Sequence, residues 1–483
     1  MPTRREQLQG YRFVTRRIVS AMLSGEPEST VLPMRRLGLA AFASFMIATI
    51  VFAGVGVYGI LRPGGKSAWK KDNTLVIERE SGARYIYQGG TLHPVLNYAS
   101  ARLIVGATAP QQVSANSLRD VPRGAAIGIV GAPDSVPSAD ALVGLPWIVC
   151  SSPRFASSTT SLATELMVGR ALPGGHGMGD KGLLVTEGST DGTMYLLWHD
   201  ERYKIPDDTS LTSLGLTGAD RSVVGTAMIS AVPQGRDLAV PRIPGKGEAG
   251  KTVDGTQHKV GDVFRSGDVY YVLMRDGLVS IHEVTAKLLL AGAQPTQVPA
   301  NAVAGDLNAR TTLEPKHFPA KVPEIESLSG SQPAVCAGYR GAKKGSVTES
   351  VTLRLYEQAP KALRPDPNAG NTTSGPADTG PVADRIVLPG GHGALVREQP
   401  QPGVTAGTTV FLVTDEGFKY ALVTSGKKNA SELLGFGGRK PVPVPVALLD
   451  LVPTGPALDP DQATRFNIVN APSPTASPQK QTD

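Results

Sequence analysis

The stretch "LPGGHG" occurs twice in this 483-residue chain, at 172–177 and again at 388–393. Two explanations fit six identical residues at two distant places. Either a histidine loop with a catalytic role is used twice, or a structural seam recurs because the protein is internally duplicated. The sequence around the two copies decides between these explanations.

Two longer matches indicate a tandem duplication. "RLIVGATAPQQVSAN" at 102–116 aligns without a gap with "KLLLAGAQPTQVPAN" at 287–301, at an offset of 185. Residues 214–235 and 434–455 both begin with Leu-Gly and end with Val-Pro-x-Gly, at an offset of 220. We therefore predict two related halves. The larger second offset is explained by residues 362–384, a Pro-, Gly- and Asn-rich stretch that we predict to be a disordered insertion.

Four predicted hairpins recur along the two halves. Each is a run of β-branched or aromatic residues, a polar turn with a glycine, and a second run. The hairpins are "TLVIERESGARYIY" at 74–87, "LLVTEGSTDGTMYLLW" at 183–198, "YYVLMRDGLVSI" at 270–281 and "FLVTDEGFKYALV" at 411–423. The sequence thus predicts four related β-rich repeats, two in each half.

The duplication answers the question of the repeated histidine. A catalytic or metal-binding histidine needs a partner, and neither His176 nor His392 has a nearby cysteine, aspartate or second histidine at ligand spacing. The flanking glycines supply backbone angles that other residues resist. We therefore predict structural turn residues at both positions. No other motif indicates a catalytic or metal site.

Residues 37–61 form a run of 25 residues without a charge, which is long enough to cross a bilayer as a helix. A signal peptide is the alternative. However, its apolar core is shorter and its leader brief, whereas 36 residues precede this run. We predict an uncleaved transmembrane helix.

Arginines predict the orientation of that helix. Seven arginines precede it and four basic residues follow closely, so the positive-inside bias favours a cytoplasmic N-terminus. The bias is modest, and the cysteines supply a second argument. The basic residues are Arg4, Arg5, Arg12, Arg16, Arg17, Arg35 and Arg36 before the helix, and Arg62, Lys66, Lys70 and Lys71 after it.

The chain has two cysteines, Cys150 and Cys336, and both follow the membrane segment. They suit either one disulfide in an oxidising compartment or two buried free thiols in a cytosolic domain. Their spacing of 186 nearly equals the repeat offset. Equivalent positions that face across a pseudo-two-fold axis can approach one another, so the duplication favours a disulfide and an extracytoplasmic C-terminal region.

One motif argues for an enzyme. "GKGEAGKT" at 245–252 matches the phosphate-binding loop pattern, in which Gly245, Gly250, Lys251 and Thr252 would bind nucleotide. A working loop follows a strand and opens a helix, but prolines precede this one and turn-rich sequence follows. We therefore predict a linker between the halves and no cofactor. ATP hydrolysis remains the alternative activity.

The N-terminal stretch "TRREQLQGYRFVTRRIVSAML" at 3–23 predicts a basic amphipathic helix. Two functions fit it. The arginines can hold the arm to an anionic lipid surface. Alternatively, the helix docks on cytoplasmic loops of partner membrane proteins, with Tyr11, Arg12, Phe13, Arg16 and Arg17 as the docking residues. The net charge of +6 is spread too evenly to indicate a nucleic-acid partner.

This N-terminal stretch, followed by one membrane helix, a cysteine pair, GGHG loops and four β-repeats, resembles the EccB family of type VII (ESX-type) secretion systems. The resemblance implies an extracytoplasmic, β-rich α+β region of four repeats around a central domain. It also implies quasi-two-fold symmetry and a disulfide that locks the halves. The implied partners are the motor EccC, the membrane subunits EccD and EccE, and the lipid bilayer. A weaker implication is binding of cell-envelope glycan through the repeats.

These observations divide the chain into an ordered series of segments. The predicted segments are a cytoplasmic helix at 1–36, a transmembrane helix at 37–61, repeat 1 at 62–120, a first central part at 121–180, repeat 2 at 181–244, a linker at 245–262, repeat 3 at 263–310, a second central part at 311–361, the insertion at 362–384, repeat 4 at 385–460 and a disordered tail at 461–483.

Overall fold

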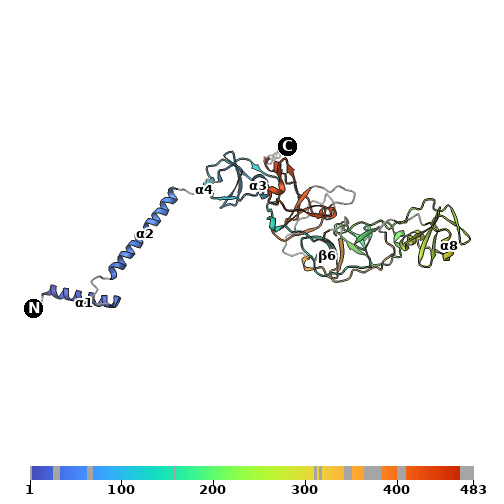
Figure 1. Cartoon of the computed structure of the whole chain (residues 1–483), viewed down its shortest axis with the longest axis horizontal. Helices are drawn as coiled ribbons and strands as arrows, with labels where there is room; N and C mark the ends of the chain where they lie inside the picture. The colour runs from blue at the N-terminus through green and yellow to red at the C-terminus, as the bar shows by residue number, and fades with distance from the viewer. Residues whose placement is uncertain are drawn as a thin grey trace, which may run out of the picture.

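The structure is a computed structural model of the whole chain (Figure 1). The residues that it describes are 3–25, 33–61, 69–156, 159–308, 313–314, 318–341, 351–363, 382–399 and 409–467. Most of the predicted insertion at 362–384 and of the tail at 461–483 therefore lies outside the described residues.

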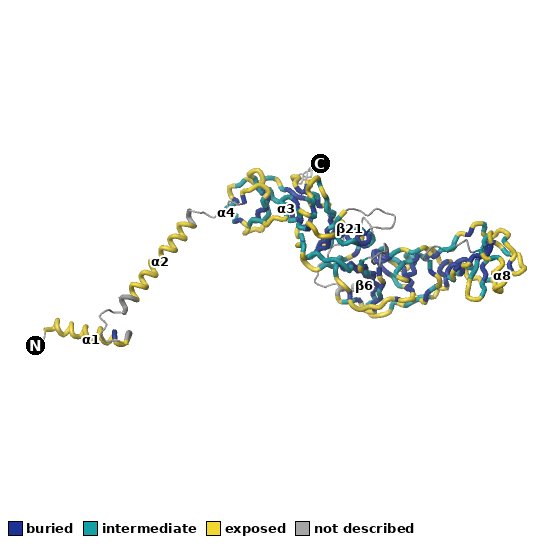
Figure 2. Tube along the Cα trace, viewed as in Figure 1, coloured by how far each residue is buried: buried dark blue, intermediate teal, exposed yellow. Residues whose placement is uncertain are grey.

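Two helices come first along the chain, α1 (Arg4–Ser24) and α2 (Pro33–Leu61). The segment Leu37–Tyr58 of α2 has a mean hydropathy of 2.1 and is long enough to cross a membrane. Figure 2 shows its described residues as exposed, which is what a lipid-facing helix requires because its apolar side chains have no protein core to enter. The predicted membrane helix is confirmed in position.

Four repeats share one topology. In each, a three-stranded antiparallel meander is followed by a helix and then by a fourth strand that pairs in parallel with the first. Repeat 1 contains β1 (Thr74–Glu78), β2 (Arg84–Gln88), β3 (Thr91–Pro94), α3 (Tyr98–Val105), β4 (Gln111–Val113) and α4 (Ala115–Leu118). Repeat 2 contains β8 (Leu183–Glu187), β9 (Met194–Trp198), β10 (Glu201–Ile205), α5 (Asp208–Ser213), β11 (Ser222–Val224) and α6 (Thr226–Ser230).

The second half repeats this order. Repeat 3 contains β14 (Val263–Ser266), β15 (Val269–Met274), β16 (Gly277–Ile281), α7 (Glu283–Leu290), β17 (Thr296–Gln297) and α8 (Ala300–Ala304). Repeat 4 contains β21 (Gly393–Glu398), β22 (Val410–Thr414), β23 (Lys419–Leu422), the small hairpin β24 (Thr424–Ser425) and β25 (Lys428–Asn429), α9 (Ala430–Leu433), β26 (Val442–Val444) and α10 (Val446–Leu449).

The four predicted hairpins are present but are not equivalent. In repeats 1 and 2 they are the first and second strands, whereas in repeats 3 and 4 they are the second and third. Sequence reasoning therefore missed one strand of every meander. The missed strands are β3, β10, β14 and β21.

The Val-Pro-x-Gly motif has a packing reason. Its third residue forms a parallel bridge to the third strand of its own repeat, and the glycine then passes over an aromatic ring on that strand. A Cβ on Gly235 would lie 2.4 Å from Tyr203, and one on Gly455 would lie 2.3 Å from Tyr420. Only glycine fits at such an approach. Repeat 1 ends with the same motif at 121–124, which lies just beyond the end that we predicted at 120.

A five-stranded sheet forms the central domain, in the order β19-β18-β6-β7-β20. Its strands are β6 (Trp147–Ala156), β7 (Thr159–Val168), β18 (Ala334–Tyr339), β19 (Val351–Tyr356) and β20 (Arg385–Val387). The hairpin β6–β7 comes from the first half and β18–β19 from the second, and they meet through the antiparallel pair β6–β18. This pair lies on the quasi-two-fold axis of the duplication.

The repeats pack crosswise at the two ends of the central sheet (Figure 1). Helix α3 of repeat 1 contacts α9 of repeat 4, and α7 of repeat 3 contacts α5 of repeat 2. Leu103 is buried with Leu412 and Phe436 in the first interface, and Leu288 with Leu211 in the second. The quasi-two-fold axis that relates the two halves also relates these two interfaces to each other.

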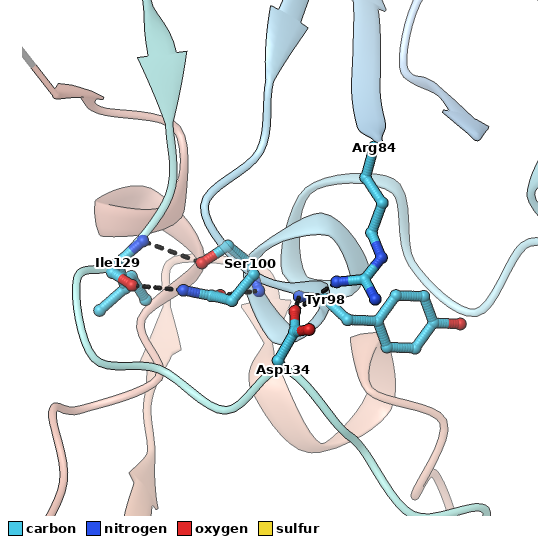
Figure 3. Close-up of polar contacts among 6 residues, drawn as sticks. Arg84, Tyr98, Ser100, Ile129 and Asp134 are labelled. Atoms are coloured by element: carbon cyan, nitrogen blue, oxygen red, sulfur yellow. Dashed lines mark hydrogen bonds and ion pairs between the residues drawn. The ribbon is translucent and has the colours of Figure 1, made fainter. Parts of the chain in front are cut away.

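A loop after repeat 1 fastens it to this arrangement (Figure 3). The backbone N–H of Ile129 donates to Ser100 Oγ at 2.8 Å, and its carbonyl accepts from Asn97 Nδ2 at 2.7 Å. Asp134 accepts the N–H of Tyr98 at 3.1 Å and is ion-paired with Arg84. Asp134 thereby satisfies one amide of the first turn of α3, which has no partner within the helix, and the carbonyl of Pro133 accepts the next, from Ala99.

Two predicted segments contain regular structure. The segment at 245–262 was predicted as a linker, and the segment at 461–483 was predicted as a disordered tail, which is wrong over 461–467. The linker at 245–262 contains a β-hairpin, β12 (Ala249–Val253) and β13 (Thr256–Lys259), because Asp254 and Gly255 both have positive φ and form a tight turn. The tail at 461–483 begins with structure, in α11 (Pro460–Ala463) and β27 (Phe466–Asn467). Strand β27 pairs with β5 (Ala126–Ile127), so the C-terminal segment returns to repeat 1. Two 3₁₀ turns, η2 (Ala139–Ala141) and η3 (Lys361–Leu363), complete the elements.

Candidate functional site

Cys150 and Cys336 form a disulfide between directly opposed residues of β6 and β18, with 4.1 Å between the Cα atoms. The predicted disulfide is confirmed. It closes a loop of 186 residues, for which the chain-entropy model gives roughly 5 kcal/mol of stabilisation. Because the bridge lies on the quasi-two-fold axis, it clamps the two halves at their centre.

Alternation along the central strands divides the sheet into two faces. Trp147, Val149 and Val335 are buried on the face that packs against repeats 2 and 4. The disulfide lies on the opposite face, with Ile148 and Met167. The period of two along each strand therefore separates the clamp from the surface that carries the repeats.

The two LPGGHG copies do not occupy equivalent places in the structure. His176 pairs with Leu355 of β19 through two backbone hydrogen bonds of 3.0 and 2.9 Å, and its Nε2 lies 3.0 Å from Glu326 Oε1. His392 instead lies in a turn directly before β21, where its N–H donates to the carbonyl of Pro389. His392 therefore lies in a turn, as predicted, whereas His176 lies in an isolated β-bridge and not in the predicted turn.

The true counterpart of the second copy is a different sequence. Gly182, directly before β8, and Gly393, the first residue of β21, each bridge to the other half where the first strand of repeats 2 and 4 begins. A Cβ on Gly182 would lie 2.8 Å from Pro323, and one on Gly393 would lie 2.7 Å from Pro137. The counterpart of "GGHG" before β21 is therefore "GDKG", which ends at Gly182. Our interpretation of the identical hexapeptides as the seam is corrected to this pair.

The phosphate-loop match lies on the hairpin β12–β13. Gly250, Lys251 and Thr252 are residues of strand β12, and Thr252 is opposite Gln257 of β13. A phosphate loop needs amides at the N-terminus of a helix, where several N–H groups converge on one anion. These residues instead donate to a strand ladder or to solvent.

The side chains around the match are engaged within the protein. Lys251 Nζ donates to the carbonyl of Asp276 at 3.1 Å and lies 3.7 Å from Asp306 Oδ1. Glu248, within the loop, pairs with Arg275 at 2.6 Å. A carboxylate at that point repels phosphate, and the lysine already has an anionic partner.

The N-terminal helix α1 presents two different faces. At 100° per residue, Tyr11, Val14 and Ile18 form an apolar stripe, and all three are exposed in the structure. Phe13 lies on the other side, where the guanidinium of Arg17 is 5.9 Å from its ring. Phe13, one of the predicted docking residues, is therefore more than a quarter turn from Ile18 and does not belong to the apolar stripe.

A family model described as "Type VII secretion system ESX-1, transport TM domain B" matches residues 1–467. The chain belongs to this EccB family. It is a membrane component of type VII secretion, as the sequence resemblance implied. The chain is 31% identical to the "ESX-3 secretion system ATPase EccB3" of Mycobacterium tuberculosis over 495 residues, which covers 94% of this chain and 88% of that protein. It is 26% identical to the "ESX-5 secretion system ATPase EccB5" of Mycobacterium marinum, with 94% and 91% covered.

Solved structures of EccB-family proteins have the same fold. The "Structure of an intact ESX-5 inner membrane complex" contains a chain with a TM-score of 0.62 and 24% identity, covering 99% of this chain and 98% of that one. The "Structure of EccB3 dimer from the ESX-3 core complex" gives a TM-score of 0.61 at 26% identity, covering 81% and 100%. The single-pass, β-rich architecture is therefore that of the family, and the family is found in an inner membrane complex.

Proposed function

We propose that this chain is a structural subunit that assembles with EccC, EccD and EccE into the secretion complex, and that it does not itself hydrolyse ATP. The observation that carries the proposal is the architecture. One membrane helix is joined to two halves that are clamped by a disulfide and packed crosswise through their repeats. Such a body suits a rigid scaffold, because its buried cores and covalent clamp resist deformation.

We further propose that α1 is cytoplasmic and that the repeats are extracytoplasmic. Arginines Arg12, Arg16 and Arg17 on α1 favour the cytoplasmic side of the membrane. The disulfide favours an oxidising compartment for the repeats, since cytosolic thiols are kept reduced. In this arrangement the exposed stripe of Tyr11, Val14 and Ile18 is available to the cytoplasmic parts of partner subunits or to lipid.

ATP hydrolysis is the second candidate, because several relatives are named as secretion system ATPases. The strand geometry of Lys251 and Thr252 and the acidic partners around Lys251 argue against it in this chain. A glycan-binding role for the repeats stays an expectation from the family resemblance.

Co-purification tests the proposal. The chain carries an affinity tag, the membranes are solubilised in mild detergent, and EccC, EccD and EccE are measured by mass spectrometry. We expect all three to be recovered with the wild type and with Lys251→Ala. We expect Arg16→Glu combined with Arg17→Glu to lose them, because reversing two charges disrupts the basic face of α1. A wild-type chain that is recovered alone would contradict the proposal.

A further inference from the structure

A cavity of about 620 Å³ lies between the central sheet and repeat 2. Ser151 and Pro153 of β6 form one wall, and Pro333 and Val335 form the next. Gly188 and Ser189, at the end of β8, form the side that belongs to repeat 2. The cavity opens to solvent and is lined by serines, prolines, valines and leucines.

The quasi-two-fold axis relates this cavity to a second place in the molecule, which is closed. Tyr339 lies three residues beyond Cys336, just as Pro153 lies three beyond Cys150, and the two cysteines are directly opposed. By the same relation, Trp147 is the counterpart of Pro333. Trp147 and Tyr339 are each 0% exposed. At one end of the β6–β18 pair, the rings of Trp147 and Tyr339 thus fill the space that Pro153 and Pro333 leave open at the other end.

Repeat 4 supplies the rest of the closed site. Gly188 donates its N–H to the carbonyl of Val224, and Gln399 donates its N–H to that of Val444, so the two residues are counterparts. The hydroxyl of Tyr339 hydrogen-bonds to Oε1 of Gln399 at 2.5 Å. The closed site therefore holds a phenol whose ring is buried and whose hydroxyl is hydrogen-bonded at the end of the repeat's first strand.

We infer that the open cavity binds a tyrosine side chain presented by another protein on the same side of the membrane. Its walls derive from the same strands that enclose Tyr339, and its own chain provides only Pro153 at the position of that ring. Ser189, which also lines the cavity, directly follows Gly188, the counterpart of the Gln399 that binds the phenol oxygen in the closed site. The inference goes beyond the proposed function, because it names a receptor site and the chemistry of its ligand.

The chain offers matched variants for testing this site. Pro153→Tyr places in the cavity the counterpart of Tyr339, and Pro333→Trp places there the counterpart of Trp147. The two variants therefore fill the cavity from different walls. Tyr339→Ala opens the closed site. The probe is p-cresol, which is the tyrosine side chain without its backbone, and binding to the detergent-solubilised full chain is measured by saturation-transfer NMR.

We expect wild-type protein to bind p-cresol at millimolar concentration. We expect Pro153→Tyr and Pro333→Trp to reduce the signal at least five-fold at an unchanged unfolding temperature, and Tyr339→Ala to add a second site. Partition of p-cresol into detergent is the same for every variant and cancels in the comparison. Absence of binding to wild type would overturn the inference, and so would equal binding to wild type and to whichever filled variants keep the wild-type unfolding temperature.

A second readout concerns the partner in cells. A photo-reactive residue is placed at Ser189, on the rim of the cavity. We expect a crosslink to a tyrosine-containing segment of another chain, and we expect Pro153→Tyr to abolish it. A crosslink that persists in Pro153→Tyr, or that joins only peptides without tyrosine, would overturn the assignment of the ligand.

Discussion

The backbone of Gly235 lies directly against the ring of Tyr203, with room for no side chain between them. Gly455 lies against Tyr420 in the same way in the other half. This contact fixes the segment after α6 or α10 onto the third strand of its repeat. It is the physical reason for the Val-Pro-x-Gly motif.

Gly235→Ala should therefore destabilise repeat 2 by about 1–3 kcal/mol, because the new methyl group must displace the tyrosine ring or the backbone. The measurement is the urea midpoint of the solubilised protein. Gly218→Ala is the control, since a Cβ there would meet nothing within 4 Å and no unusual φ is required. Equal midpoints for the two variants would contradict this account of the motif.

Removing the disulfide should weaken the contact between the halves. Cys150→Ala with Cys336→Ala is expected to lower the free energy of unfolding by about 2–5 kcal/mol, because the unfolded chain regains the entropy of a long loop. Thiol labelling of unreduced, denatured wild-type protein should detect no free cysteine. Two reactive thiols per chain would show that the clamp is not formed in the cell.

The C-terminal helix α11 makes a pH-dependent contact with repeat 4, between Asp459 at its N-cap and Ser425 of β24. Hydrogen bonds from Ser425 and from the N–H of Asp461 hold the pKa of Asp459 below its usual value. Its contribution to stability is therefore present above the unfolded pKa near 3.8 and is lost as the pH falls through the lower folded value.

Asp459→Ala should cost about 1 kcal/mol at pH 7, as the loss of a helix N-cap typically does, and less if solvent screens the site. The difference from wild type should shrink as the pH falls below 4. The unfolding temperatures of both proteins, measured from pH 7 to pH 3, check this. A difference that stays constant over that range would exclude a titrating Asp459.

The two faces of α1 make separable predictions. Ile18→Asp places a charge in the exposed apolar stripe and should release the helix from lipid or a partner, because burying an unpaired carboxylate is unfavourable. Gln9→Asp carries the same charge at an exposed polar position and serves as its control. Recovery of EccD from solubilised membranes measures the effect. Loss with both variants would point to charge alone and not to the stripe.

The sequence predicts the repeats because duplication leaves a direct record in it. The offset shared by residues 102–116 and 287–301 relates the helix and fourth strand of repeat 1 to those of repeat 3, and both pairs have the predicted register. The membrane helix could also be predicted from the sequence, since the thickness of a bilayer requires a long uncharged run.

Other features depend on contacts that a single sequence does not display. The copies of LPGGHG are identical, yet the packing of Pro137 and Pro323 assigns the equivalence to Gly393 and Gly182. Sequence identity in a glycine-rich turn carries little information about register, because glycine fits many backbone conformations. The pairing of Tyr339 with Gln399 is similarly invisible, since these residues lie far apart in the chain and in different elements.

The hairpin at 249–259 lies in a segment that the sequence analysis interpreted as a linker. Its glycines and lysines resemble those of a flexible connection, but Asp254-Gly255 is a strong turn signal flanked by short strands. The hairpin also argues against nucleotide binding at the phosphate-loop match, because its residues lie in a strand and a nucleotide site would need them at the start of a helix.

The central claim is that this chain contributes structure and not ATP hydrolysis to the secretion complex. The most direct measurement is the rate of ATP hydrolysis by the purified full chain, free of EccC, compared with Lys251→Ala under the same conditions. The account predicts no turnover above background in either protein. Turnover by the wild type that is lost in Lys251→Ala would contradict it and would establish the loop at 245–252 as a working nucleotide site.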